Sequence, residues 1–192
     1  MLNIVLFGPP GAGKGTQSAR LIEKYNLMHV STGELLRAAI KADTSIGQEA
    51  RKFIDHGNLV PDEMVLTIIE NLLDKHTEVA GFVFDGFPRT TNQAICFDAM
   101  LKAKGSGIAL MLSLEVSEAE LTSRLANRSK IDGRADDKDM SIIANRIKVY
   151  NQQTAIVADF YKAQNKHVPV DGMGSMDDIF VRIAAGVEAH RK

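Results

Sequence analysis

The stretch LNIVLFGPPGAGKGT runs from Leu2 to Thr16 and decides the fold of this chain. It begins with an apolar run typical of a buried strand, Leu2 to Phe7, and continues into the glycine-rich segment Gly8 to Thr16. A helical pattern follows from Gln17 to Tyr25. A strand, a glycine-rich turn and a helix in this order are the context that a phosphate-binding loop requires. The stretch therefore predicts a polyphosphate site; the alternative is a glycine-rich turn that binds nothing.

The chemistry expected of this loop comes from its glycines and its lysine. Glycines let backbone N–H groups point at a polyphosphate with no Cβ in the way, and the following helix adds free N–H groups and the positive end of its dipole. Lys14 supplies a mobile cation for the outer phosphates. Such loops usually have Ser or Thr directly after the lysine, whereas Gly15 stands here and Thr16 follows. The sequence therefore leaves open whether the loop touches Mg²⁺ directly.

The size and composition of the chain indicate one α/β domain. Its 192 residues are 45% hydrophobic and 24% charged, with a net charge of −1, so nothing favours binding to nucleic acid or to an anionic membrane. No apolar run approaches membrane-spanning length, we expect no targeting leader, and a single cysteine, Cys96, makes neither a disulfide nor a cysteine-based metal site. We expect a cytoplasmic monomer, with Cys96 as a small core residue and the five histidines as structural or solvated side chains.

Further apolar runs alternate with helical patterns along the chain, at residues 27–30, 82–84, 108–114 and 167–170. This alternation predicts a parallel sheet covered by helices on both faces, a three-layer α/β/α arrangement whose ligands bind at the carboxyl ends of the strands.

Two segments are longer or more polar than simple connections require. Residues 32–60 carry two short helical patterns and predict an inserted helical subdomain, whereas residues 127–138 are polar and predict a mobile surface loop.

A carboxylate stands at the end of the third predicted strand, in the phrase FDGFPRT from Phe84 to Thr90. Because parallel strands end at the same edge, Asp85 is placed beside the phosphate loop, where a hard cation such as Mg²⁺ would meet it, often through water. The alternative is that Asp85 only caps a turn. Gly86 and Pro88 predict a rigid turn that aims Arg89 back over the strand ends.

Arginines recur in the segments expected near this edge. Planar guanidinium groups can clamp the equatorial oxygens of a transferring phosphoryl group. Any one of these residues could be a solvated surface charge, but the set occurs together with a phosphate loop. The set comprises Arg37, Arg89, Arg128, Arg134 and Arg146.

The motifs together resemble the adenylate kinase family, in order and over nearly the whole chain. They are GPPGAGKGT at 8–16, STGELLR at 31–37, LVPD at 59–62, DGFPR at 85–89 with Gln93, GR at 133–134 and GMGS at 172–175.

The resemblance implies a fold of the P-loop NTPase type with a five-stranded parallel sheet. It implies a monophosphate-binding subdomain at 31–60, a short lid at 127–138, and the Mg²⁺-dependent reaction ATP + AMP ⇌ 2 ADP. Some family members have a longer lid with four zinc-binding cysteines. The lid of this chain is short and cysteine-free, so we expect no structural zinc.

The resemblance also assigns residues to the two nucleotides. The expected ATP-binding set is Gly11, Ala12, Gly13, Lys14, Gly15, Thr16, Arg124, Arg128 and Gly174. The expected AMP-binding set is Thr32, Arg37, Asn58, Leu59, Val60, Gly86, Phe87, Pro88, Arg89, Gln93, Arg134 and Arg146. The charges expected to act in catalysis are Lys14, Arg89, Arg128, Arg134 and Arg146.

Two of these residues bear on which monophosphate is accepted. In the family that the chain resembles, Thr32 and Gln93 mark an AMP site, whereas the related UMP/CMP kinases usually have Ala in place of the threonine. A glutamine amide can pair with both a donor and an acceptor on the adenine edge. Thr32 could instead only begin a helix after Ser31.

Other nucleotide-binding classes are the alternatives. A guanine-specific switch needs an Asn-Lys-x-Asp base reader, and the sequence from Asn165 to Val168 lacks its final Asp. A hydrolytic ATPase or a nucleotide-binding module is compatible with the phosphate loop, but it would not need a second site built from Thr32, Arg37, Arg89 and Gln93.

Overall fold

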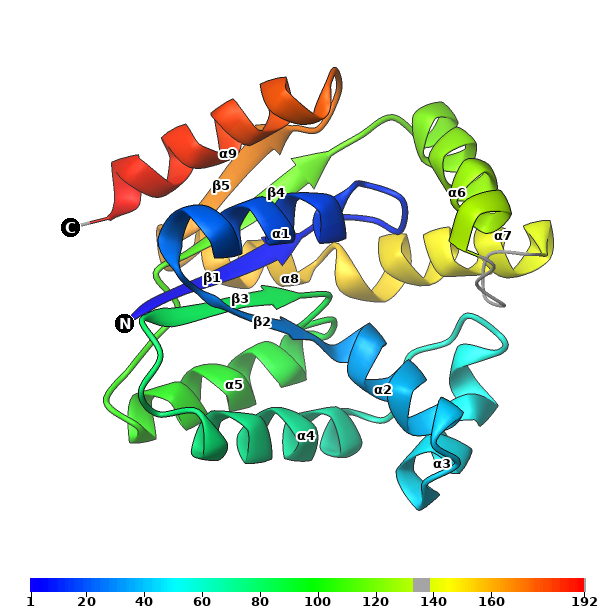
Figure 1. Cartoon of the computed structure of the whole chain (residues 1–192), viewed down its shortest axis with the longest axis horizontal. Coiled ribbons are helices and arrows are strands. Elements are labelled where there is room, and N and C mark those ends of the chain that lie inside the picture. The colour runs from blue at the N-terminus through cyan, green and yellow to red at the C-terminus, as the bar shows by residue number, and fades with distance from the viewer. Residues whose placement is uncertain (133–138, 192) are drawn as a thin grey trace.

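A five-stranded parallel sheet forms the centre of this computed structural model (Figure 1). The structure describes residues 1–132 and 139–191, except for the side chains of 129–132. The strands lie in the order β2-β3-β1-β4-β5, so the first strand is central. They are β1 (Leu2–Phe7), β2 (Met28–Ser31), β3 (Gly81–Asp85), β4 (Leu110–Glu115) and β5 (His167–Asp171). Each of them coincides to within two residues with an apolar run of the sequence, and the predicted α/β fold is confirmed.

Helices cover both faces of the sheet (Figure 1). α1 and α9 pack on one face, and α4, α5 and α8 lie on the other. The helices are α1 (Lys14–Tyr25), α2 (Thr32–Lys41), α3 (Ser45–Ile54), α4 (Asp62–Lys75), α5 (Thr91–Ala103), α6 (Glu118–Asp132), α7 (Met140–Val149), the π-helix η2 (Tyr150–Thr154), α8 (Val157–Lys162) and α9 (Met176–His190).

Alternate residues of the central strand feed two separate cores. Ile4 and Leu6 pack in the cluster under α1 and α9, whereas Val5 and Phe7 pack in the cluster under α4, α5 and α8. All four side chains are at most 5% exposed. Because successive side chains of a strand point to opposite faces, an unbroken apolar run such as Leu2 to Phe7 is what a strand covered on both sides requires.

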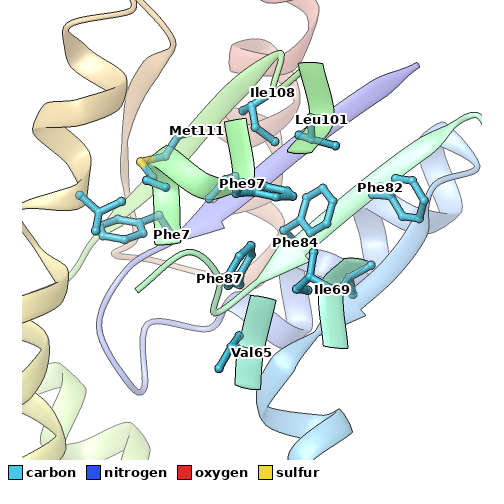
Figure 2. Close-up of a cluster of buried hydrophobic side chains, with 14 of the residues drawn as sticks. Phe7, Val65, Ile69, Phe82, Phe84, Phe87, Phe97, Leu101, Ile108 and Met111 are labelled. Atoms are coloured by element: carbon cyan, nitrogen blue, oxygen red, sulfur yellow. The ribbon is translucent and has the colours of Figure 1, made fainter. Parts of the chain in front are cut away.

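The larger core contains a stack of aromatic rings between the sheet and α5 (Figure 2). The ring of Phe97 meets Phe84 edge-on with a centroid distance of 4.8 Å and meets Phe87 edge-on at 4.9 Å. Cys96, the neighbour of Phe97, is only half-buried. The expectation of a core position for Cys96 is therefore wrong, because α5 turns Ala94, Phe97 and Leu101 inward and leaves Cys96 on its flank.

The strand register brings functional segments to one edge of the sheet. Asp85 of β3 pairs with Leu6 of β1 and with Ser31 of β2, so the ends of three strands meet next to the glycine-rich loop. α2 and α3 project beyond this edge (Figure 1). The two helices pack so closely at Gly47 that a Cβ there would lie 2.1 Å from the Ala39 carbonyl oxygen.

The aromatic stack predicts a large loss of stability when Phe97 is truncated. Phe97→Ala removes a fully buried ring with two aromatic neighbours, and we expect the free energy of unfolding to fall by about 3–5 kcal/mol. Urea unfolding measures the change. Ile95→Ala on the same helix is the control: Ile95 is 53% exposed, so its change should stay near about 0.5 kcal/mol. Equal losses in the two variants would contradict this account of the core.

Candidate functional site

The glycine-rich loop joins the end of β1 to the start of α1. The loop lies directly against α6: a Cβ on Gly11, whose φ is +85°, would lie 2.9 Å from Leu125 Cγ and 3.0 Å from the Leu121 carbonyl oxygen. Only glycine combines this backbone conformation with such a close approach. The loop therefore holds a tight curve at the N-terminus of α1, where helix N–H groups favour an anion.

Lys14 lies inside this curve. Its Nζ donates hydrogen bonds to the carbonyl oxygens of Gly8, at 2.8 Å, and Pro9, at 3.0 Å. Burial, opposed by the charge of Asp85 and helped by the charges of Arg89, Arg146 and Arg128, lowers the pKa of Lys14 from its usual value near 10.5 to about 8. A bound anion would stabilise the charged form of this ammonium group, because it would offset both the cost of burying the charge and the repulsion from the neighbouring cations.

Asp85 is the carboxylate at the centre of this positive edge. Its side chain is 12% exposed, and its Oδ2 lies 3.8 Å from Nε2 of His29. Burial raises the pKa of Asp85, but contact with His29 and the charges of Lys14 and Arg89 lower it by more, so the pKa lies below its usual range. The contact with Asp85 raises the pKa of His29 in turn. Asp85 is therefore held as an anion beside the phosphate loop.

A cavity opens from this loop toward α2 and α3. One wall is apolar and comes from the inserted helical segment and α4, with Leu36, Ile54, Val60 and Val65. The opposite wall comes from the end of α7 and from η2. Asn145 of α7 joins the two walls, because its Nδ2 donates to the His56 carbonyl oxygen at 2.8 Å and to Asn58 Oδ1 at 3.1 Å.

The end of the cavity next to the sheet is polar. The Gly86 carbonyl oxygen accepts hydrogen bonds from Thr32 Oγ1, at 3.0 Å, and from Arg89 Nε, at 2.7 Å. Gln93 is 2% exposed, and its Oε1 accepts a hydrogen bond from the Arg89 backbone N–H at 2.7 Å. The turn after β3, the start of α2 and the start of α5 are thus tied together at the cavity surface.

The cavity brings together most of the residues expected to bind AMP. Those that line it are Thr32, Arg37, Asn58, Leu59, Val60, Gly86, Pro88, Arg89, Gln93 and Arg146, together with Lys14 of the loop. Phe87 does not line it, because its side chain is 1% exposed and belongs to the aromatic stack (Figure 2). Arg134 lies outside the described residues.

The residues expected to bind ATP lie around the loop. Gly11, Ala12, Gly13, Gly15 and Thr16 belong to the loop or to the first turn of α1. Arg124 of α6 links the loop to the turn after β5: its guanidinium donates to the Ala12 carbonyl oxygen at 3.4 Å and to the Gly172 carbonyl oxygen at 3.1 Å. Gly174 follows in that same turn, before α9.

Several residues at this site carry no distinct signal in the sequence. Leu36, Ile54 and Val65 line the cavity, but their apolar pattern is the same as that of a core position. His29 had no metal-ligand spacing and was expected to be structural or solvated, yet it contacts Asp85. The only signal that could have found it is its place on β2, two residues before the strand ends at Ser31.

Two other kinds of site are absent from the described residues. Within residues 1–132 and 139–191, no helix is both long and apolar enough to cross a bilayer. In the same part of the chain, no three or more His, Cys, Asp and Glu side chains gather as metal ligands would.

Comparison with known proteins gives consistent results. The family model described as adenylate kinase matches residues 6–166. A protein of Parabacteroides distasonis named adenylate kinase is 46% identical over 187 residues, which cover 97% of this chain and 98% of that protein. Adenylate kinases of Phocaeicola vulgatus and of Porphyromonas gingivalis strain ATCC 33277 are 48% and 45% identical, and the alignments cover 98% and 100% of this chain and 99% and 98% of those proteins. The match and these relatives span nearly all of the strands and loops described above, and the chain belongs to the adenylate kinase family.

Proposed function

We propose that AMP occupies the cavity, that ATP occupies the glycine-rich loop, and that the two react across Lys14 in the adenylate kinase reaction, ATP + AMP ⇌ 2 ADP. One observation carries the proposal: a single cavity runs from Lys14 to Thr32, Arg37, Arg89 and Gln93. A nucleotide hydrolase needs only the loop, whereas a phosphotransferase between nucleotides needs an acceptor site next to it.

The charges have separate roles in this proposal. Arg37 and Arg89 hold the AMP phosphate from two sides of the cavity, and Gln93 meets the adenine edge. Lys14, Arg128 and Arg146 neutralise the charge that spreads over the oxygens of the transferring group. The proximity of these three is supported by the lowered pKa of Lys14, to which both arginines contribute. Arg134 is proposed for the same role on the basis of the motif GR at 133–134.

No general base is required. The phosphate of AMP is already largely dianionic at neutral pH, since the second pKa of a phosphate monoester is about 6. The chain contributes position and electrostatics: it aligns the attacking oxygen and supplies preorganised cations.

Water has to be kept out of the site, because it competes with AMP for the phosphoryl group. We propose that the subdomain at 31–60 and a lid at 127–138 close over the two nucleotides. The contact between Asn145 and the segment 56–58 supports closure of the 31–60 subdomain. Residues 133–138 of the proposed lid lie outside the described residues.

The residues near the loop fit an Mg²⁺ ion that the substrate brings with it. Asp85 offers one anionic oxygen ligand at the strand ends, and the position after Lys14 is a glycine without a hydroxyl. A single carboxylate suits a cation that keeps most of its waters and phosphate ligands. Bound Mg²⁺ would neutralise charge on the phosphates, with Asp85 holding one of its waters. We propose no structural zinc, and we propose that the chain acts as a monomer on nucleotides alone.

Replacement of Arg89 tests the acceptor site. We expect MgATP to give ADP with AMP but little with UMP, CMP or GMP, and we expect Arg89→Ala to lower kcat/KM for AMP by about 100-fold or more, because a preorganised guanidinium is lost. A coupled ADP-formation assay measures both.

The matched control is Arg191→Ala, an arginine at the end of α9 that stacks over Tyr25 and does not line the cavity. It should retain full activity. A preference for UMP or CMP would mean that Thr32 and Gln93 do not select adenine, and phosphate release without an acceptor would place the chain among ATPases.

The lowered pKa of Lys14 predicts that ATP binding weakens at high pH. Below about pH 8 the ammonium is already charged; above it, binding of ATP must take up a proton, so affinity falls by at most tenfold per pH unit. Between pH 7.5 and 9.5, where the phosphates of ATP no longer titrate, we expect the Kd for MgATP to rise by about tenfold or more. Calorimetry in buffers of different ionisation enthalpy measures the Kd and the proton uptake.

Lys14→Met is the control for this pH dependence. It should bind MgATP more weakly at every pH, with a flat profile and no proton uptake between pH 7.5 and 9.5. A flat profile for the unmodified chain would show that Lys14 is not the titrating group.

A further inference from the structure

The side-chain amide of Gln93 has two protein partners of opposite kinds. Its Nε2 donates to Asp62 Oδ1 at 2.8 Å, and its Oε1 accepts from the Arg89 backbone N–H at 2.7 Å. An ionised carboxylate can only accept hydrogen bonds, and a backbone N–H can only donate. Rotation of the amide by 180° would set the NH₂ group against the Arg89 N–H and Oε1 against the carboxylate. The two partners therefore fix one of the two possible orientations of the amide.

Asp62 is itself held in place. Its second oxygen, Oδ2, accepts from Thr90 Oγ1 at 2.9 Å and from Asn92 Nδ2 at 3.0 Å. The Thr90 hydroxyl in turn accepts from the Gln93 backbone N–H at 3.1 Å, where it caps α5. Asp62 is the first residue of α4, a position that the helix dipole makes favourable for an anion. This network connects the starts of α4 and α5, which lie 28 to 31 residues apart along the chain.

The amide has further capacity beyond these contacts. A glutamine amide has two N–H donors and an oxygen with two lone pairs, and one of each is used by Asp62 and Arg89. Gln93 lines the cavity, so the remaining N–H and lone pair can serve a ligand. Adenine offers an acceptor, N1, next to a donor, the 6-amino group. A 6-oxopurine offers the reverse, an N1–H donor next to the O6 acceptor.

We infer that Asp62 is a specificity-determining residue, which locks the Gln93 amide in the orientation that accepts a 6-aminopurine monophosphate and rejects a 6-oxopurine one. The inference rests on the proposed function, in which Gln93 meets the base of the acceptor. With the amide locked, a 6-oxopurine sets donor against donor and acceptor against acceptor. A buried site that leaves such groups unpaired discriminates strongly against the wrong base. Asp62 acts through Gln93 and is a positioning residue.

The test compares AMP with IMP, because these monophosphates differ only at the base edge in question. Asp62→Asn keeps the size of the side chain but lets it donate as well as accept, so the carboxylate no longer excludes the turned amide and only the Arg89 N–H still opposes it. We expect the ratio of kcat/KM for AMP to kcat/KM for IMP to fall at least tenfold in this variant. A merely structural role would lower both values together and leave the ratio unchanged, and that result would overturn the inference.

Two further variants complete the experiment. Asn92→Ala removes one donor to Oδ2 of Asp62 but leaves the contact between Asp62 and Gln93, so the ratio should stay at its original value. If Asp62→Asn does not fold, Asp62→Ser replaces it, since a hydroxyl can also donate and accept. If the unmodified chain does not phosphorylate AMP, the proposed function fails and takes the inference with it. If AMP is phosphorylated but the ratio does not respond at position 62, only the inference fails.

Discussion

Mutual repulsion among cations at the carboxyl edge of the sheet is the interaction on which the site depends. Lys14 lies there within the influence of Arg89, Arg128 and Arg146. Burial is the main cause of its lowered pKa, and repulsion from these three arginines lowers the pKa as well. Asp85 opposes it with one negative charge. Polyphosphates carry negative charge, which would offset the excess of positive charge at this edge. Under the proposed function, the same positive edge would provide binding energy for the nucleotides and a driving force for the proposed closure around them.

The rest of the fold keeps these charges close together. Two apolar cores, one on each face, immobilise the strands whose ends carry the loop and Asp85. The parallel register then fixes which residues meet, since Leu6, Ser31 and Asp85 lie at one level across three strands. A scaffold that rigid can hold like charges near one another, because moving them apart would break strand pairing or open a core. The stability of the sheet and of the two cores thus compensates for the electrostatic repulsion between cations at the site.

The sequence predicts this architecture well where the signal is local. The apolar runs, the loop at Gly8 to Thr16 and the turn around Asp85 each carry their pattern within a few residues, and the α/β fold and the family follow from them. Contacts across long separations are less visible. That Phe87 turns into the aromatic stack depends on packing against the helix that follows it, and that His29 meets Asp85 depends on packing between strands far apart in the chain.

The pairing of Gln93 with Asp62 shows the same limit. Both residues stand in motifs that identify the family, and the amide of Gln93 is expected to meet a base. Nothing in the sequence indicates that the carboxylate of Asp62, 31 residues away, accepts a hydrogen bond from that amide. A polar residue in a motif can serve a ligand, a neighbouring helix, or both, and only three-dimensional contacts distinguish these roles.

The central position of β1 has a consequence for synthesis of the chain. This strand is made first, yet its partners are β3, at 81–85, and β4, at 110–115. At ribosomal speeds of roughly 5–20 residues per second, the gap between β1 and β4 lasts on the order of 5–20 s. During that interval the apolar strand at Leu2 to Phe7 has no sheet to join, and its edges are open to other nascent chains. Folding of this chain during synthesis therefore depends on how well β1 is shielded until β3 and β4 have been made.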